Sequence, residues 1–394
     1  MKTFINKESD VTMLLMYITA AVTVLSQIEG ISAVARPLMY AAWGAMVVVS
    51  FFGKGNKSRF SLFTMGFSVL YLCFAVFCIL CTLFGRDHLH ANMLSVLVIP
   101  LIVTVVTNMS LSRMTKQQFF NLSVVYVCVA LIFAVYINVI YFPSLQIWFS
   151  SRIYTFMEKN SAAQIWSIAL ILLFFVIIPQ MKRYRVLGYL AIGYLIFISG
   201  LSQCRTALLG VAAVFVFYFL RLPTKKKLIV LGVLLAVLLL LLLIPGIRSY
   251  LSHVFLLDKY TENSDVNDIS SGRIKNYEKA LGLFMDASLI GTGKYYVDSF
   301  YINVLTENGV IGALIIYIIW GLRISRNFVV NRQYNAVPSV RKDMIVCLTI
   351  FFFIESVMEG YPPFGPGVSS FMFWLLCSLD YSRIGASEGP VWAS

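Results

Sequence analysis

The chain is a succession of apolar runs separated by short polar segments, and this pattern constrains the fold more than any other feature. Hydrophobic residues make up 59% of the 394 residues and charged residues only 12%. An ordinary soluble domain has about 25% charged residues, so this chain cannot cover itself with a polar surface. Because one crossing needs about 20 apolar residues, we expect an all-α polytopic membrane protein and not a soluble domain on one anchor.

The apolar runs predict about twelve transmembrane helices in a single integral membrane domain covering residues 1–394, whose first span is retained rather than cleaved as a signal peptide. The predicted spans are 11–28, 34–52, 61–84, 92–108, 119–141, 161–180, 186–203, 206–220, 228–244, 300–322, 343–358 and 368–381. Residues 186–220 carry Arg205 as their only charge, and a single helix there would be about 52 Å long against a hydrocarbon core of about 30 Å. We therefore expect the chain to turn back at SGLSQCRT.

Lys and Arg gather in clusters between the apolar runs, as they do in cytoplasmic loops. Residues 182–185 and 221–227 are both basic, so both flanks of the turn at Arg205 should be cytoplasmic and the turn itself outside. The same rule puts Arg323 and both termini inside, with 384–394 as a flexible tail. The net charge of +13 therefore orients helices, and the absence of a basic stripe with interleaved aromatics argues against nucleic acid as a partner.

Neither the cysteines nor the histidines indicate a metal or redox centre. Most of the seven cysteines lie inside apolar runs and are interpreted as small buried hydrophobic residues. His88 and His90 share a short segment without a cysteine partner and are interpreted as solvated loop residues. We predict no metal and no cofactor.

Two outer segments are long enough to build a site. Residues 142–160 mix aromatic and basic side chains, Arg152 among them, and are predicted to lie in the membrane interface. Residues 245–299, between the ninth and tenth spans, are where titratable groups concentrate. Within them, 272–286 has the periodicity of an amphipathic helix, with Ser271 as its N-cap. Arg273 falls beside the apolar face, which includes Tyr277, and Lys275 and Lys279 fall opposite.

Polar side chains also stand at the ends of two late spans. Asp298 and Tyr301 are three residues apart and would share a helix face at the start of the tenth span, and Glu355 and Glu359 end the eleventh. A purely structural role remains an alternative for each of these charged groups. Arg205 could reach outward to the membrane interface and Arg273 could be a solvated charge. Asp298 could pair with a helix dipole, and the two glutamates could be carboxylates at the membrane interface. The glycines of GTG at 291–293 are expected to form an ordinary turn.

Three motifs carry a family resemblance. SQCRTALLG follows a mid-chain span, SGR opens a helix in a long outer loop, and GTGKYYVDSFYINVLTENGVIG runs into a span. In this order they resemble the O-antigen polymerases of the Wzy type and the related O-antigen ligases, most strongly over 195–320. Ligases of this superfamily usually place a histidine near the start of the late span, where this chain has Asp298-Ser-Phe-Tyr301, and this departure favours a polymerase.

The resemblance implies a glycosyltransferase of GT-C-like architecture at the periplasmic face of a bacterial inner membrane. Such an enzyme joins oligosaccharide repeat units carried on undecaprenyl pyrophosphate, as donor and acceptor, into O-antigen or a related surface polysaccharide. The implied reaction is an inverting displacement without a metal, and a chain-length regulator and membrane lipid are the partners that such an enzyme would have. The alternatives are an O-antigen ligase acting on lipid A core and a twelve-span transporter or flippase of lipid-linked glycan.

The resemblance and the positions together assign roles to individual residues. Arg205 and Arg273 are expected to clamp the pyrophosphate leaving group, with Arg152 as a third member, because a guanidinium binds phosphate oxygens bidentately. Asp298 is expected to serve as the base for the acceptor hydroxyl. The remaining predicted substrate-binding residues are Tyr301, Tyr277 and Glu355.

Overall fold

The computed structural model of the chain describes residues 2–52, 62–109, 114–141, 159–181, 183–202, 204–246, 272–333, 339–364 and 368–379. These residues are helical and contain no β-strand. The helices are α1 (Lys2–Leu25), α2 (Glu29–Phe52), α3 (Leu62–Leu83), α4 (Ala91–Met109), α5 (Lys116–Tyr141), α7 (Lys159–Leu172), α8 (Arg185–Leu201), α9 (Arg205–Arg221), α10 (Thr224–Leu242), α13 (Arg273–Asp286), α14 (Phe300–Gln333), α15 (Ser339–Met358) and α16 (Val368–Ser378).

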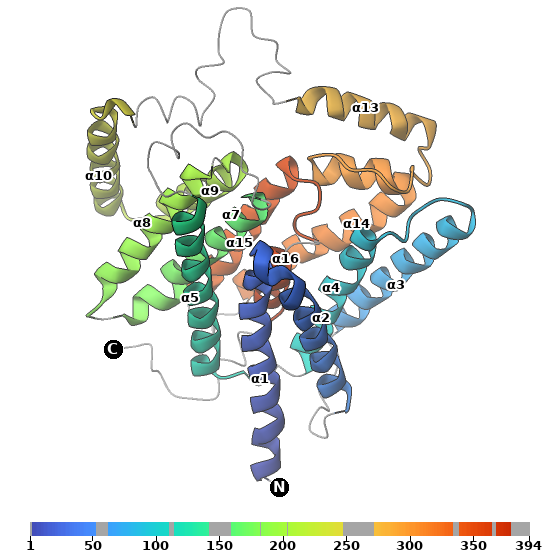
Figure 1. Ribbon diagram of the computed structural model, residues 1–394, viewed down its shortest axis with the longest axis horizontal. Coiled ribbons are helices and arrows are strands. Elements are labelled where there is room, and N and C mark those ends of the chain that lie inside the picture. Colours follow the sequence, from blue (N-terminus) through green and yellow to red (C-terminus); the bar gives the residue numbers. More distant parts are fainter. Residues whose placement is uncertain are drawn as a thin grey trace, which may run out of the picture.

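Each of the twelve predicted apolar runs corresponds to a helix (Figure 1). The remaining helix, α13, lies outside these runs, in the segment between the ninth and tenth. The run 161–180 continues from α7 through a π-helical turn, Leu173–Ile177, and a 3-10 turn, Ile178–Gln180. Among the described residues, five helices are long and apolar enough to cross a membrane, and two more are apolar but shorter. The fold is therefore that of an all-helical, polytopic membrane protein, and twelve crossings stay a prediction.

The long apolar stretch 186–220 breaks where its length requires. α8 ends at Leu201 and α9 begins at Arg205, and the Cys204 backbone N–H donates to the Ser199 carbonyl across the turn. Thr206 and Gly210 are buried on α9, and the ring of Phe351 on α15 lies directly against Gly210. Since any side chain at Gly210 would overlap this ring, α9 and α15 approach closely, which brings the ends of both helices to one place.

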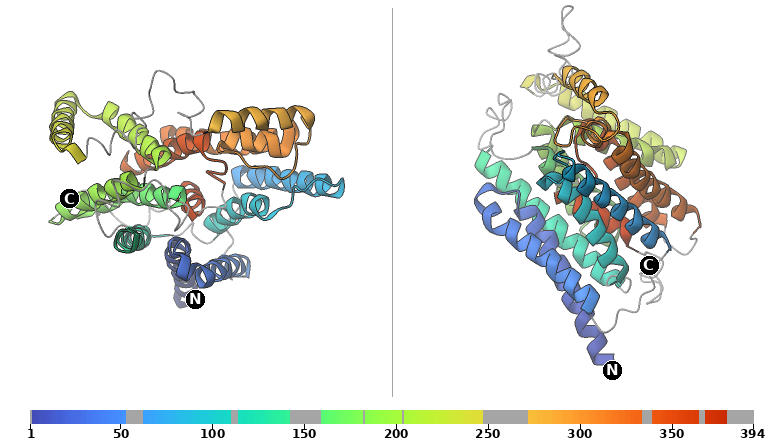
Figure 2. Two further views of the ribbon diagram at one scale, coloured as in Figure 1. Left: turned by 45° about the horizontal axis from the view of Figure 1, so that its top comes forward. Right: turned by 90° about the vertical axis from the view of Figure 1, so that its right-hand side faces the viewer.

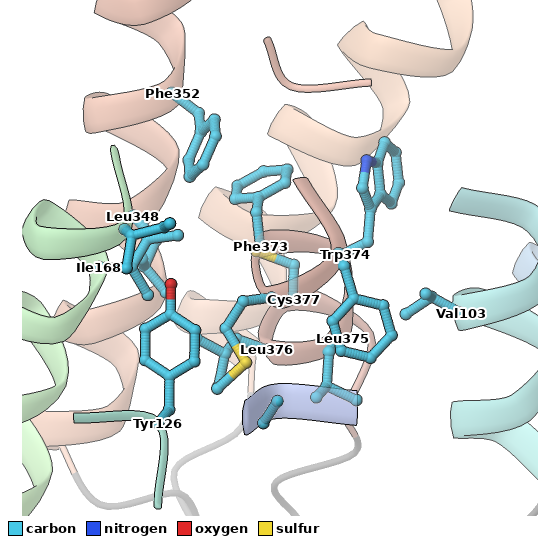
Figure 3. Packing of buried hydrophobic residues seen from close by; sticks show 14 of the residues in the cluster. Val103, Tyr126, Ile168, Leu348, Phe352, Phe373, Trp374, Leu375, Leu376 and Cys377 are labelled. Atoms are coloured by element: carbon cyan, nitrogen blue, oxygen red, sulfur yellow. The ribbon is translucent and has the colours of Figure 1, made fainter. Parts of the chain in front are cut away.

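Helices α7, α15 and α16 build the centre of the bundle, with α4 and α5 on either side (Figure 3). The rings of Phe352 on α15 and Phe373 on α16 lie 4.4 Å apart, and Trp374 continues the aromatic layer. The Trp374 indole N–H donates to the Pro363 carbonyl, so the buried polar group is satisfied. This core fixes the end of α15, at which part of the site is built.

Arg323 has a structural role besides the cytoplasmic position that the sequence predicts for it. Its side chain is buried at 1% exposure. Its guanidinium donates to the Cys377 carbonyl and the Ser378 hydroxyl, both at 3.0 Å, and lies over the Trp374 ring at 4.7 Å. Arg323 therefore joins α14 to α16 instead of facing water.

The stretch predicted as an amphipathic helix over 272–286 contains α13 (Arg273–Asp286), which lies alongside α14 at one end of the molecule (Figures 1 and 2). Its N-cap is Gly272, at φ 83°, with no side-chain cap; the predicted N-cap Ser271 lies outside the described residues. Lys275 and Lys279 are exposed, and Ala280 is buried, as the helical phase predicted. Arg273 is turned toward the body of the protein.

α14 is a helical hairpin and not a straight span. Its backbone breaks at Gly309, with φ 62° and ψ −172°. The Tyr317 hydroxyl donates to the Tyr301 carbonyl, and the two rings lie 6.0 Å apart, whereas 16 residues of straight helix would separate them by about 24 Å. The arm 300–308 therefore doubles back on the arm 310–333 (Figure 1). The prediction of one straight span over 300–322 was wrong in its first residues, because periodicity does not reveal a single reversal.

The segment before α14 fills the break. The backbone N–H groups of Thr292 and Gly293 donate to the carbonyls of Thr306 and Glu307, and those of Val310 and Ile311 donate to Ser288 and Leu289. These bonds replace the ones that a continuous helix would make, which allows a helix to break in an apolar setting. The ordinary turn expected at 291–293 lies instead at 287–290, and Gly291 and Gly293, both with positive φ, belong to the segment that bonds to α14.

Two histidines complete this junction, and their interpretation as solvated loop residues was wrong. His88 is buried, and its Nε2 lies 2.8 Å from the Ile290 carbonyl. His90 Nε2 pairs with Oε1 of Glu307, whose side chain is fully buried in the first arm of α14. The loop between α3 and α4 is thus locked into the break, a contact between segments 217 residues apart. The only sign of this contact in the sequence was Glu307, which is the one charged residue of the predicted span 300–322.

Candidate functional site

Two arginines far apart in the sequence form the cationic part of the site. Arg205 is the first residue of α9 and Arg273 the first of α13, so each side chain stands at a helix N-terminus, where the backbone also favours anions. Partial burial lowers the pKa of the Arg205 guanidinium, and the nearby positive charge of Arg273 lowers it further. The structure thus brings together the two residues that the sequence assigned to a clamp.

Arg273 is held by two carboxylates through loose ion pairs. Its Nε lies 3.7 Å from Oδ2 of Asp298, and its Nη2 lies 3.6 Å from Oε1 of Glu359. Its Nη1 faces the Met358 sulfur at 3.6 Å. Hydrogen bonds between nitrogen and oxygen are usually 2.7–3.2 Å long, so these contacts orient the guanidinium but leave its donors available to a stronger anion such as a phosphate.

Asp298 lies at the edge of the site. Its side chain is 39% exposed, and its carbonyl accepts a hydrogen bond of 2.6 Å from the Tyr277 hydroxyl of α13. It precedes the helix that begins at Phe300, so it does not share a helix face with Tyr301 as predicted. The Tyr277 hydroxyl therefore ties α13 to the segment before α14, and burial raises the pKa of this hydroxyl.

Glu359 was predicted only as a carboxylate at the end of the eleventh span, but it lies inside the site. It follows the last residue of α15, and its Oε1 accepts a hydrogen bond of 2.8 Å from Asn160 at the start of α7 and one of 3.5 Å from Thr206 on α9. Burial raises the pKa of Glu359 to about 7, with the charge of Arg273 opposing the rise. The only sequence sign of this role was its position just past a predicted span.

Glu355 and Tyr301 lie beneath the site. Glu355 is 1% exposed, one turn before Glu359, and its Oε2 accepts a hydrogen bond of 2.9 Å from Gln164. The Tyr301 hydroxyl accepts hydrogen bonds from Trp320 and Ser356, so it joins the two arms of α14 to α15. Both side chains support the site from below. The other predicted member, Arg152, lies outside the described residues.

The assembled groups suit an anionic ligand next to a hydroxyl nucleophile. Two guanidinium groups and two helix N-termini can hold phosphate oxygens, and the adjacent carboxylates can orient a hydroxyl or take its proton. Across the described part of the chain, no three His, Cys, Asp or Glu side chains are grouped so that they could hold a metal ion.

Residues 190–317 match the family model described as O-antigen ligase. The matched region begins in α8, includes Arg205, Arg273 and Asp298, and ends in the second arm of α14. A search of curated proteins found no match. The match supports the superfamily of O-antigen ligases and polymerases and a membrane role in O-antigen-related glycan processing. It does not distinguish a ligase from a polymerase.

Proposed function

We propose that this protein is a polysaccharide polymerase that joins lipid-linked repeat units at the periplasmic face of a bacterial inner membrane. The observation that carries the proposal is the placement of Arg205 and Arg273, two helix N-terminal residues inside a region that matches the O-antigen ligase family, around one carboxylate: Glu359 contacts both Arg273 and Thr206, the residue after Arg205. Donor and acceptor would both be oligosaccharides on undecaprenyl pyrophosphate. Asp298, where ligases usually have a histidine, favours a polymerase.

The two guanidinium groups would stabilise the leaving group. As the bond between the donor sugar and pyrophosphate breaks, negative charge grows on the phosphate oxygens, and preorganised cations lower the energy of that state. Arg273 would exchange its loose contacts with Asp298 and Glu359 for phosphate oxygens. One of these carboxylates would orient the acceptor hydroxyl; the sequence assigned this role to Asp298.

A ligase acting on lipid A core is the second candidate, because the matched family model carries that description. The two acceptors separate the candidates in a deletion strain analysed by gel electrophoresis of surface glycan. Loss of a polymerase leaves core capped with a single repeat unit, loss of a ligase leaves core without any, and an unchanged ladder would exclude both.

Complementation of the deletion strain tests the arginine clamp. We expect R205A and R273A to lower polymer formation by about a hundredfold or more, since each removes a donor that acts on the developing charge. R273K should recover little, because an ammonium does not reproduce bidentate binding. K279A, on the exposed side of α13, is the matched control and should leave the ladder unchanged. Full-length polymer from stably inserted R205A and R273A would rule out the clamp.

A further inference from the structure

Glu359 stands where four elements of the site converge. It follows α15, and its Oε1 contacts Asn160 of α7, Thr206 of α9 and Arg273 of α13. Its side chain is only 8% exposed. Thr206 directly follows Arg205, so Glu359 contacts the helix end that carries Arg205 as well as Arg273 itself.

The two oxygens of Glu359 have different surroundings. Within the described residues, Oε1 makes all the polar contacts of the Glu359 side chain. Oε2 has no protein hydrogen-bond donor among these residues, so this oxygen can accept a proton from a ligand. The Oε1 contacts hold the carboxylate in one orientation, which an acid–base group requires.

A second pair of contacts fixes this orientation from below. Asn160 and Gln164 are one turn apart on α7, and Glu359 and Glu355 are one turn apart at the end of α15. The amide of Asn160 donates to Glu359 at 2.8 Å, and that of Gln164 donates to Glu355 at 2.9 Å. These two side-chain hydrogen bonds, one turn apart, hold the end of α15 against α7.

Asp298 is placed differently. Its carboxylate contacts the Nε edge of Arg273 at 3.7 Å and is 39% exposed. Its backbone carbonyl is bound by the Tyr277 hydroxyl of the helix that carries Arg273. These contacts orient Arg273 and α13, and no buried contact fixes the Asp298 carboxylate itself among the described residues.

We infer that Glu359 is the catalytic base for the acceptor hydroxyl and that Asp298 is a positioning residue for Arg273. This inference rests on the proposed function, because it names a group within the proposed glycosyl transfer. It replaces the assignment of the base to Asp298.

The proposed step balances as a displacement. The acceptor hydroxyl oxygen forms a bond to the anomeric carbon of the donor sugar, while the bond from that carbon to the pyrophosphate oxygen breaks. The electron pair leaves with the lipid pyrophosphate, whose charge Arg205 and Arg273 hold. The hydroxyl proton goes to Oε2 of Glu359 and is later released to water.

Donor binding would prepare this base. When a pyrophosphate takes the Arg273 donors, Glu359 loses the cation that stabilises its negative charge, and its affinity for a proton rises. In the free protein, burial already raises the pKa of Glu359 to about 7, close to the value at which a base is both deprotonated and effective near neutral pH.

Purified protein in lipid nanodiscs tests the inference, with undecaprenyl-pyrophosphate-linked repeat units extracted from the deletion strain as substrate. We expect E359Q to lower kcat by about a hundredfold or more while binding undecaprenyl pyrophosphate as the wild type does. Because a base must be deprotonated, wild-type kcat/KM should rise with pH through a pKa near 7, and E359Q should lose this rise. E278Q, an exposed carboxylate on α13, is the matched control.

The D298N variant decides between the two carboxylates even where E359Q does not accumulate. A slower D298N that keeps the rise of kcat/KM with pH supports the inference, and a D298N that loses this rise overturns it. Wild-type rates in E359Q would also overturn it, with the proposed function intact as long as R205A is inactive. A wild type that never lengthens the glycan would instead reject the proposed function.

Discussion

At the scale of single residues, buried ionic groups with incomplete partners mark both the site and the junction that supports it. Glu359 shares one oxygen among three donors, and Glu307 pairs with His90 through one oxygen while its Oε2 is buried without a hydrogen bond among the described residues. A buried carboxylate depends strongly on each remaining contact, because desolvation has removed the alternative of water.

The pair of His90 and Glu307 gives a stability prediction. H90A should lower the thermal midpoint of the detergent-solubilised protein, since it leaves the fully buried Glu307 carboxyl without its hydrogen-bond partner, and an unsatisfied buried polar group costs about 1–3 kcal/mol. The double variant H90A/E307Q should be more stable than H90A, because a neutral amide costs less to bury than an unpaired carboxylate. Thermal unfolding followed by size-exclusion chromatography measures both. Strictly additive effects of H90A and E307Q would show that the two residues are not coupled.

The sequence predicted which charged residues would meet better than it predicted their partners. Arg205, Arg273 and Asp298 stood out because charges are scarce in this chain, and the structure brings them together. Asn160 and Thr206 did not stand out, because a single amide or hydroxyl at a helix end is common. Their contacts with Glu359 depend on how α7 and α9 meet α15, which local sequence does not encode.

At the scale of elements, the hairpin of α14 positions the segment that carries Asp298. Gly309 makes the reversal possible, because its φ of 62° is a conformation that residues with a side chain rarely adopt. The backbone nitrogens of Gly291 and Ile290 would lie 2.5 Å from a Cβ atom at this position. Glycine is therefore required twice, for its backbone angle and for the close approach.

G309A should disrupt this reversal. We expect a loss of several kcal/mol, because backbone strain adds to the overlap with the 290–291 backbone, and a loss of polymer formation as the segment around Asp298 shifts. Limited proteolysis of the purified protein and the glycan ladder of the complemented strain measure the two effects. G321A, in the second arm with open space around it, is the control and should behave as wild type.

The end of a helix could be predicted where the length of an apolar run exceeds the thickness of a membrane. It could not be predicted where contacts with a distant segment break the helix. The break between α8 and α9 follows from the thickness of a membrane, and the structure has it at Leu201–Arg205. The break in α14 occurs within a run that reads as one 29-residue apolar helix, Phe300–Phe328. Only the backbone bonds from residues 288–293 make that break stable.

At the scale of the whole molecule, the site is assembled from α7, α9, α13, the segment before α14 and the end of α15. These parts come from both sides of the segment 247–271, and they meet at the end of the bundle where α13 lies (Figure 1). A site built from five segments depends on their all reaching the same side of the membrane. The orientation predicted from the basic clusters places that side in the periplasm.

Cysteine labelling in a cysteine-free background tests this orientation. K279C, on the exposed side of α13, should react with a membrane-impermeant maleimide in intact spheroplasts. R183C and K225C, in the basic flanks of 186–220, should react only after the membrane is opened. Equal labelling of all three in intact spheroplasts, or the reverse pattern, would contradict the predicted topology.

The contacts of the junction inside α14 join residues that are synthesised at very different times. Chains emerge from the ribosome N-terminal end first, so the loop that carries His88 is made long before its contact Ile290, 202 residues later. Residues 288–293, whose backbone groups bond to both arms of α14, precede Gly309 in the sequence and are therefore translated before the residue at which the helix reverses. The carbonyls of Ser288 and Leu289, which accept the N–H groups at the start of the second arm, are thus synthesised before that arm, and of the site's segments the end of α15 is synthesised last.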